Sequence, residues 1–143
     1  MLTAKTTELE LTEIWFDSEP EHNRLRATFP INKWAGSRDS AVVYFEVEPG
    51  KRLARHTDSA EEILYVVAGE AEAEVGDERG RLEVGDLAVI PAMVPHGLVN
   101  VGDETVKVVG FFSESEIVST FKEPVQPFDV TVVNQGAPVP APA

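Results

Sequence analysis

Residues 50–69, GKRLARHTDSAEEILYVVAG, are the stretch that decides both the fold and the chemistry predicted for this chain. The stretch contains His56, Asp58 and Glu62, which lie two and four positions apart. Successive side chains of an extended chain alternate between its two faces, so all three can point to the same side. Imidazole and carboxylate groups on one face are ligands that first-row divalent metals accept. The stretch therefore predicts a metal site built on strand.

The segments beside this stretch predict further strands. In residues 41–48, AVVYFEVE, Glu46 and Glu48 mark a solvent-facing side, which sends three apolar residues inward: Val43, Phe45 and Val47. Residues 62–68, EILYVVA, are apolar on both faces after Glu62, which is typical of a sandwich interior or of a subunit interface.

The rest of the chain continues the pattern of short strands. An edge strand is expected at 8–16 and others at 24–29, 70–75, 81–84, 87–90 and 105–113, with a hairpin turn at 76–80, while 114–134 predicts one strand or a short helix. Turn signals recur every 8–12 residues and no long segment has helical periodicity. We therefore expect an all-β protein, a small antiparallel barrel or jelly roll.

Length and composition predict one domain and exclude several partners. The 143 residues suggest an N-terminal strand and connector at 1–23, a barrel at 24–134 and a flexible Pro/Ala tail at 135–143. The net charge of −13 argues against nucleic acid and anionic membranes as partners. Because the chain has no cysteine, any metal must bind through nitrogen and oxygen. With no signal-peptide pattern and no apolar run of ~18 residues, we expect a cytoplasmic protein.

Two motifs in this sequence resemble those of the cupin family. The first runs Gly, five residues, His, one residue, His, three or four residues, Glu, six residues, Gly; Gly50, His56, Glu62 and Gly69 match it, and Asp58 stands at the second histidine. The second runs Gly, five residues, Pro, one residue, Gly, two residues, His, three residues, Asn. Its matches are Gly85, Pro91, His96 and Asn100, with Met93 at the second glycine. The resemblance implies a double-stranded β-helix, or jelly-roll barrel, with one metal ion bound inside it.

Carried onto this sequence, the resemblance implies His56, Glu62 and His96 as metal ligands. Two imidazoles and one carboxylate form the facial set of non-haem iron(II) sites, with positions left open for substrate or dioxygen. Asp58 could be a fourth ligand, orient a bound water or accept a proton. The alternative is that these histidines are ordinary pocket residues. The metal itself, one divalent iron, manganese, nickel or zinc ion, stays open.

Other residues are weaker candidates. Three apolar residues could line the substrate pocket or simply pack in the core: Met93, Val108 and Phe112. Three basic residues before His56 could attract an anionic substrate at the mouth of the barrel or form a solvated turn: Lys51, Arg52 and Arg55.

The leading functional hypothesis is a metal-dependent dioxygenase-type oxidoreductase that acts on a small molecule, with Asp58 and Glu62 as catalytic residues. Non-redox isomerisation or elimination at the same metal is the second. A small-molecule-binding barrel without turnover is the third. Since both faces of 62–68 are apolar, we also expect a homodimer, with residues 1–23 as a candidate part of its interface.

Overall fold

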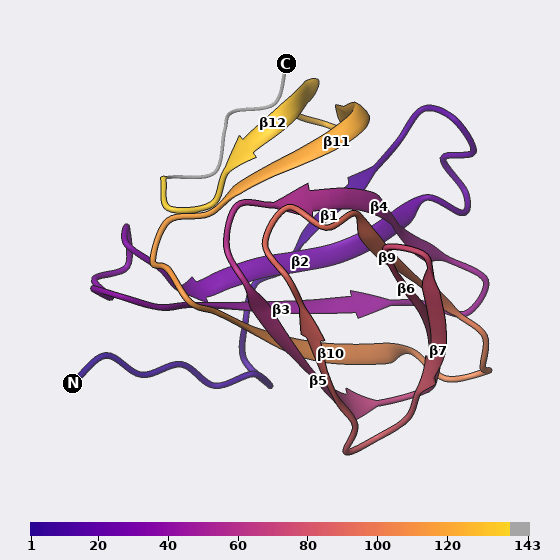
Figure 1. Ribbon diagram of the computed structural model, residues 1–143, viewed down its shortest axis with the longest axis horizontal. Helices are drawn as coiled ribbons and strands as arrows, with labels where there is room; N and C mark the ends of the chain where they lie inside the picture. The colour runs from indigo at the N-terminus through magenta and orange to yellow at the C-terminus, as the bar shows by residue number, and fades with distance from the viewer. Residues whose placement is uncertain (138–143) are drawn as a thin grey trace.

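The computed structural model describes residues 1–137, which form strands and turns without any helix (Figure 1). The strands, in chain order, are β1 (Thr12–Trp15), β2 (Arg24–Ile31), β3 (Ala41–Val47), β4 (Arg52–Asp58), β5 (Glu62–Ala68), β6 (Ala71–Val75), β7 (Glu78–Leu82), β8 (Leu87–Ile90), β9 (His96–Asn100), β10 (Val106–Phe112), β11 (Val118–Val125) and β12 (Val130–Asn134). None of these described segments is a helix that could cross a membrane. The all-β prediction is confirmed.

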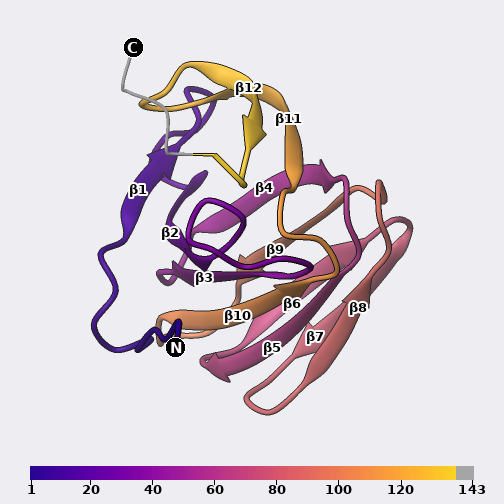
Figure 2. The same ribbon diagram turned by 90° about the vertical axis from the view of Figure 1, so that its left-hand side faces the viewer.

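The strands form two six-stranded antiparallel sheets that face each other (Figures 1 and 2). One sheet has the order β1-β2-β3-β10-β5-β8 and the other the order β12-β11-β4-β9-β6-β7. From β3 to β6 and again from β7 to β11, each connection carries the chain from one sheet to the other. This winding is that of a jelly roll, and it turns one face of every central strand toward a shared interior.

The interior is apolar where the two sheets meet. Val43, Phe45 and Val47 are 7%, 4% and 0% exposed, which confirms the inward face predicted for this strand. On β10 the inward positions are Val106, Val108, Gly110 and Phe112, as alternation requires. One contiguous hydrophobic core spans both sheets.

Strand β5 is buried on one face only. Leu64 and Val66 are 4% and 1% exposed, whereas Ile63, Tyr65 and Val67 are 41%, 38% and 39% exposed. The prediction that this strand lies in a sandwich interior on both faces is therefore wrong for its outer face, because β5 and its neighbours form the outer layer of the molecule. The apolar outer face is left as a surface of the single chain.

Two further expectations need correction. The hairpin turn is shorter than 76–80, because Glu78, Arg79 and Gly80 already belong to β7 and only Gly76 and Asp77 form the turn. Residues 114–134 contain two strands, β11 and β12, rather than one strand or a helix. The predicted flexible tail at 135–143 falls largely on 138–143, which lie outside the described residues.

Candidate metal centre

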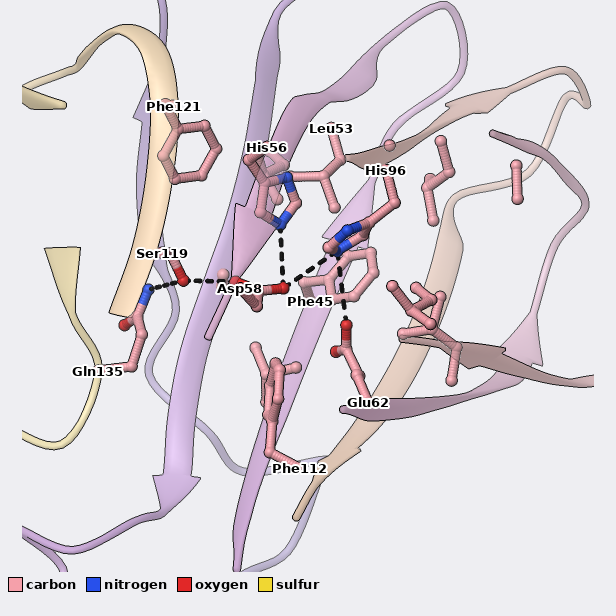
Figure 3. A pocket seen from close by; sticks show the side chains of 18 of the residues that line it. Phe45, Leu53, His56, Asp58, Glu62, His96, Phe112, Ser119, Phe121 and Gln135 are labelled. Carbon is pink, nitrogen blue, oxygen red and sulfur yellow. Dashed lines mark hydrogen bonds and ion pairs between the residues drawn. The ribbon is translucent and has the colours of Figure 1, made fainter. Parts of the chain in front are cut away.

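The predicted ligands surround a cavity between the two sheets. This inner cavity has a volume of about 80 Å³, and most of its wall is apolar. Its polar side chains gather at one side (Figure 3): His56, Asp58, Glu62, His96, Ser119 and Gln135. The ionisable groups among them are buried, with His56 at 9% exposure and Asp58, Glu62 and His96 at 3% to 4%.

His56 and Asp58 share the inward face of β4, as their two-residue spacing predicts. Glu62 does not continue that strand. The chain turns at residues 59–61, and Glu62 begins β5 in the opposite sheet. The expectation that all three residues share one extended segment is therefore wrong, and Glu62 faces the others because both sheets turn one face to the same interior.

The fourth group comes from β9, which pairs with β4 and places His96 directly opposite His56. The two ring centroids are 4.3 Å apart. Nδ1 of His56 lies 2.8 Å from the carbonyl oxygen of Ala54, and Nδ1 of His96 lies 2.9 Å from that of Val94. A carbonyl oxygen only accepts, so each Nδ1–H donates and each neutral ring keeps its lone pair on Nε2.

These Nε2 atoms face carboxylate oxygens rather than hydrogen-bond donors. Oδ2 of Asp58 lies 3.4 Å from Nε2 of His56 and 3.0 Å from Nε2 of His96, and Oε1 of Glu62 lies 3.7 Å from Nε2 of His96 (Figure 3). Nε2 of His96 is buried and makes no hydrogen bond of acceptable geometry. When the rings are neutral, their Nε2 lone pairs face the Asp58 carboxylate, an arrangement that a cation would stabilise.

The tightest cluster consists of His56, Asp58 and His96, whose ligand atoms all lie within 4.8 Å of one another. Glu62 lies at its edge, where His96 is the imidazole in contact with its carboxylate. Two nitrogens and one or two carboxylate oxygens are ligands suited to a divalent transition metal, so the residues present fit such an ion. In this geometry Asp58, the departure from the usual cupin pattern, is the more central of the two acids.

The two buried carboxyl groups have opposite electrostatic environments. Burial raises the pKa of Asp58, but the hydrogen bonds and positive charge that His56 and His96 provide when their rings are protonated outweigh burial and hold that pKa well below the usual value. Burial, with the nearby Asp58 carboxylate, raises the pKa of Glu62 well above its ordinary value. In the absence of a metal, Asp58 is the ionised group and Glu62 retains its proton to higher pH.

Residues from the C-terminal strands complete the centre, and the sequence analysis did not identify them. Ser119 on β11 lies opposite Asp58 on the neighbouring strand β4. Its Oγ donates a 2.6 Å hydrogen bond to Oδ1 of Asp58. Nε2 of Gln135 donates to Oγ of Ser119 over 3.5 Å. The ring of Phe121 stacks on His56 with centroids 4.7 Å apart. The two-residue spacing of Ser119 and Phe121 is compatible with a strand. Nothing in the local sequence indicated that this strand would pair with β4.

Gly110 on β10 makes room for Glu62. A Cβ at this position would lie 2.2 Å from Oε2 of Glu62 and 2.7 Å from Cγ1 of Val43, far inside van der Waals contact. Any side chain here would therefore displace the carboxylate from the cavity.

The three pocket candidates occupy three different environments. Phe112 lines the inner cavity. Val108 is fully buried in the core and is not among the residues that line the cavity. Met93 lies on the surface at 60% exposure, in the loop before β9, and its φ of 64° is the left-handed conformation that a glycine favours at this motif position.

The basic residues before His56 lie away from the cavity and are paired. Lys51 contacts Glu48, Arg52 contacts Glu19, and Arg55 contacts Glu74. They belong to the outer side of β4 and its preceding turn, and none of the three lines the inner cavity.

Comparisons with known proteins agree with this architecture. A family model described as "Cupin domain" matches residues 43–112. "Protein SchB" of Streptomyces halstedii is 31% identical over 108 residues, which cover 72% of this chain and 78% of that protein. The 3-hydroxyanthranilate 3,4-dioxygenase of Bacillus thuringiensis (strain Al Hakam) is 40% identical over 73 residues, 47% of this chain. The match spans only 41% of that dioxygenase.

A solved structure supports the same fold. An uncharacterised conserved protein with a double-stranded β-helix domain from Klebsiella pneumoniae superposes with a TM-score of 0.57 at 26% identity, covering 64% of this chain and 77% of that one. The two motifs, the winding of the sheets and these matches lead to one assignment: the chain belongs to the cupin family.

Proposed function

We propose that this protein is a metal-dependent enzyme that holds one divalent transition metal at His56, Asp58 and His96, with Glu62 at the edge of the site, and oxidises a small organic substrate with dioxygen. One observation carries the proposal: in a buried cavity Oδ2 of Asp58 lies 3.4 Å from Nε2 of His56 and 3.0 Å from Nε2 of His96, and Nε2 of His96 makes no hydrogen bond. The named relative that is a dioxygenase supports oxygenation as the reaction type.

The protein residues have separate roles in this proposal. A bound redox-active metal would supply coordination positions for substrate and dioxygen. The backbone carbonyls of Ala54 and Val94 fix the two imidazole rings in the tautomer that presents Nε2. Ser119 fixes Oδ1 of Asp58, which leaves Oδ2 directed at the imidazoles. The apolar wall excludes water from the reacting atoms.

A specific observation favours a second candidate function, a non-redox isomerase or lyase. Glu62 lies at the edge of the cluster, with Oε1 3.7 Å from Nε2 of His96, where its carboxyl group can transfer a proton to or from a substrate. Asp58, with its lowered pKa, could accept one. Two carboxyl groups with divergent pKa values are the arrangement that acid–base chemistry uses. A binding barrel without turnover is the third candidate.

Elemental analysis and metal titration test the metal centre. We expect about one equivalent of iron, manganese, nickel or zinc in the purified protein. His96→Ala should lose most of it, whereas His22→Ala should retain it, because His22 is exposed in the connector before β2. Equal metal content in the two variants would refute the proposed centre.

Oxygen consumption separates the three functions. An oxygenase should consume dioxygen with phenolic or enolic substrates and stop under anaerobic conditions. An isomerase or lyase should convert its substrate equally well without oxygen. Saturable binding of such compounds without any product would favour the binding barrel and contradict both enzymatic proposals.

A further inference from the structure

A second cavity adjoins the metal centre. This outer cavity, between β1–β2 and β11–β12, has a volume of about 320 Å³. It shares five lining residues with the inner cavity: Ile14, Ala27, Phe29, Phe121 and Gln135. The two cavities therefore adjoin at these residues, which places the outer cavity next to the ligand cluster.

The small volume of the inner cavity favours a substrate that extends into the outer one. The inner cavity measures about 80 Å³, whereas a cavity that binds benzene in a protein core is roughly 150 Å³. A ring-sized molecule cannot fit in the inner cavity alone, still less beside a metal ion. The reacting end of a substrate would enter the inner cavity, and the rest would remain in the outer one.

The outer cavity offers aromatic surface and neutral polar groups. Four aromatic residues contribute to its wall: Phe29, Trp34, Phe121 and Phe128. Trp34 is 70% exposed, at the open side. Its polar lining consists of hydroxyls and amides only: Thr12, Thr28, Asn32, Asn134 and Gln135. Stacking surface with scattered hydrogen-bonding groups suits flat aromatic molecules that carry hydroxyl or carbonyl oxygens.

The charge of the lining excludes anions. Neither cavity is lined by a lysine or arginine among residues 1–137, and residues 138–143 contain neither in the sequence. Arg26 and Lys33, which neighbour lining residues in sequence, contact Glu46 and Glu116. An anionic group remote from the metal would therefore be buried without a partner, in a chain of net charge −13.

We infer that the substrate is an uncharged aromatic molecule, larger than one ring, whose hydroxyl or carbonyl end reaches the metal centre while its body occupies the outer cavity. This inference rests on the proposed function for the role of the metal. The substrate in the dioxygenase relative's name, 3-hydroxyanthranilate, is an anion, so the inferred specificity departs from that relative.

A matched pair of probes tests the charge preference in zinc-loaded protein, where no oxidation can occur. 2,3-Dihydroxynaphthalene is neutral, and its 6-sulfonate adds only a fixed negative charge remote from the diol. We expect calorimetry to show at least tenfold tighter binding of the neutral diol. Equal or tighter binding of the sulfonate would overturn the inference, as would failure of the diol to bind.

A pair of variants on β12 tests the location. Val133 lines the outer cavity, whereas neighbouring Val132 is 54% exposed and does not. Val133→Trp should weaken diol binding at least tenfold without changing zinc affinity, and Val132→Trp should change neither. If Val133→Trp binds both zinc and the diol as tightly as the unaltered protein, the diol does not occupy the outer cavity and the inference is overturned. If Val133→Trp does not fold, the comparison of the diol and its sulfonate on the unaltered protein still tests the inference.

Metal-free protein with 2-naphthol separates the two proposals. Binding of 2-naphthol that Val133→Trp abolishes, in a protein that takes up no zinc, would refute the proposed function and support the outer cavity as an aromatic site. Zinc uptake without binding of either naphthalene compound would refute the inference and leave the proposed function standing.

Discussion

Replacement of Glu62 by glutamine should stabilise the metal-free protein and weaken its metal site. The carboxyl group of Glu62 is 4% exposed, and burial together with Asp58 raises its pKa well above 4.5, the value expected in the unfolded chain. Glutamine has nearly the same shape and cannot ionise. The substitution therefore removes the cost of keeping this carboxyl group protonated above pH 4.5, and it leaves no cavity.

The magnitude follows from proton linkage. Above pH 4.5 the unfolded chain releases this proton while the folded chain keeps it, so the contribution of Glu62 to stability, present below that pH, is lost as pH rises. The loss is about 1.4 kcal/mol per pH unit until the folded pKa is passed. The glutamine variant should thus match the unaltered protein near pH 4.5 and gain about 1.4 kcal/mol over it for each pH unit above that value, until the folded pKa is passed. For this chain length each pH unit corresponds to roughly 3–6 °C in Tm.

Thermal unfolding of chelator-treated protein from pH 4.5 to 7 provides the measurement, with Glu61→Gln as the matched control, because Glu61 is exposed on the neighbouring position. Added zinc should reverse the order, since a ligand at 100 times its Kd stabilises by about 2.7 kcal/mol and glutamine is the poorer donor. Equal pH profiles for Glu62→Gln and the unaltered protein would refute the reasoning, because the carboxyl group would then not be buried as a costly charge.

Three further outcomes follow from the same geometry. Ser119→Ala should lower zinc affinity about 10–100-fold in a chelator competition, and Ser119→Thr should restore it; unaltered affinity in Ser119→Ala would show that Asp58 needs no support. Gly110→Ala should displace Glu62 and destabilise the fold by about 1–3 kcal/mol in urea, while Gly80→Ala, where an added Cβ has no neighbour within 4 Å, should not. The exposed apolar outer face of β5 should pair with a second copy of the chain, so light scattering should give a mass of twice 15.6 kDa. Tyr65→Glu should reduce the measured mass to that of one chain. A single-chain mass for the unaltered protein would contradict the predicted dimer.

The sequence was sufficient for the parts of the fold that depend on alternation. The alternation of apolar and polar positions defined the inward face of β3, because a strand sends successive side chains to opposite sides. The same rule placed His56 and Asp58 together on β4. Motif spacing indicated that His96 would join them.

Alternation says which face a residue occupies, and it does not say which strands are neighbours. The position of Glu62 depends on a turn that changes sheet, and the hydrogen bond from Ser119 to Asp58 joins residues 61 positions apart. The sequence gives no reason to expect Met93 at the surface, because its neighbours are apolar. The loop before β9 exposes it.

The sequence by itself therefore determined that this protein is built of strands and that its imidazole and carboxylate groups can share an interior. Only the tertiary structure decided that Asp58 rather than Glu62 lies between the imidazoles, and that an uncharged aromatic cavity adjoins them. The physical reason is that the period of a strand is local, whereas strand pairing and cavity shape depend on contacts between distant segments.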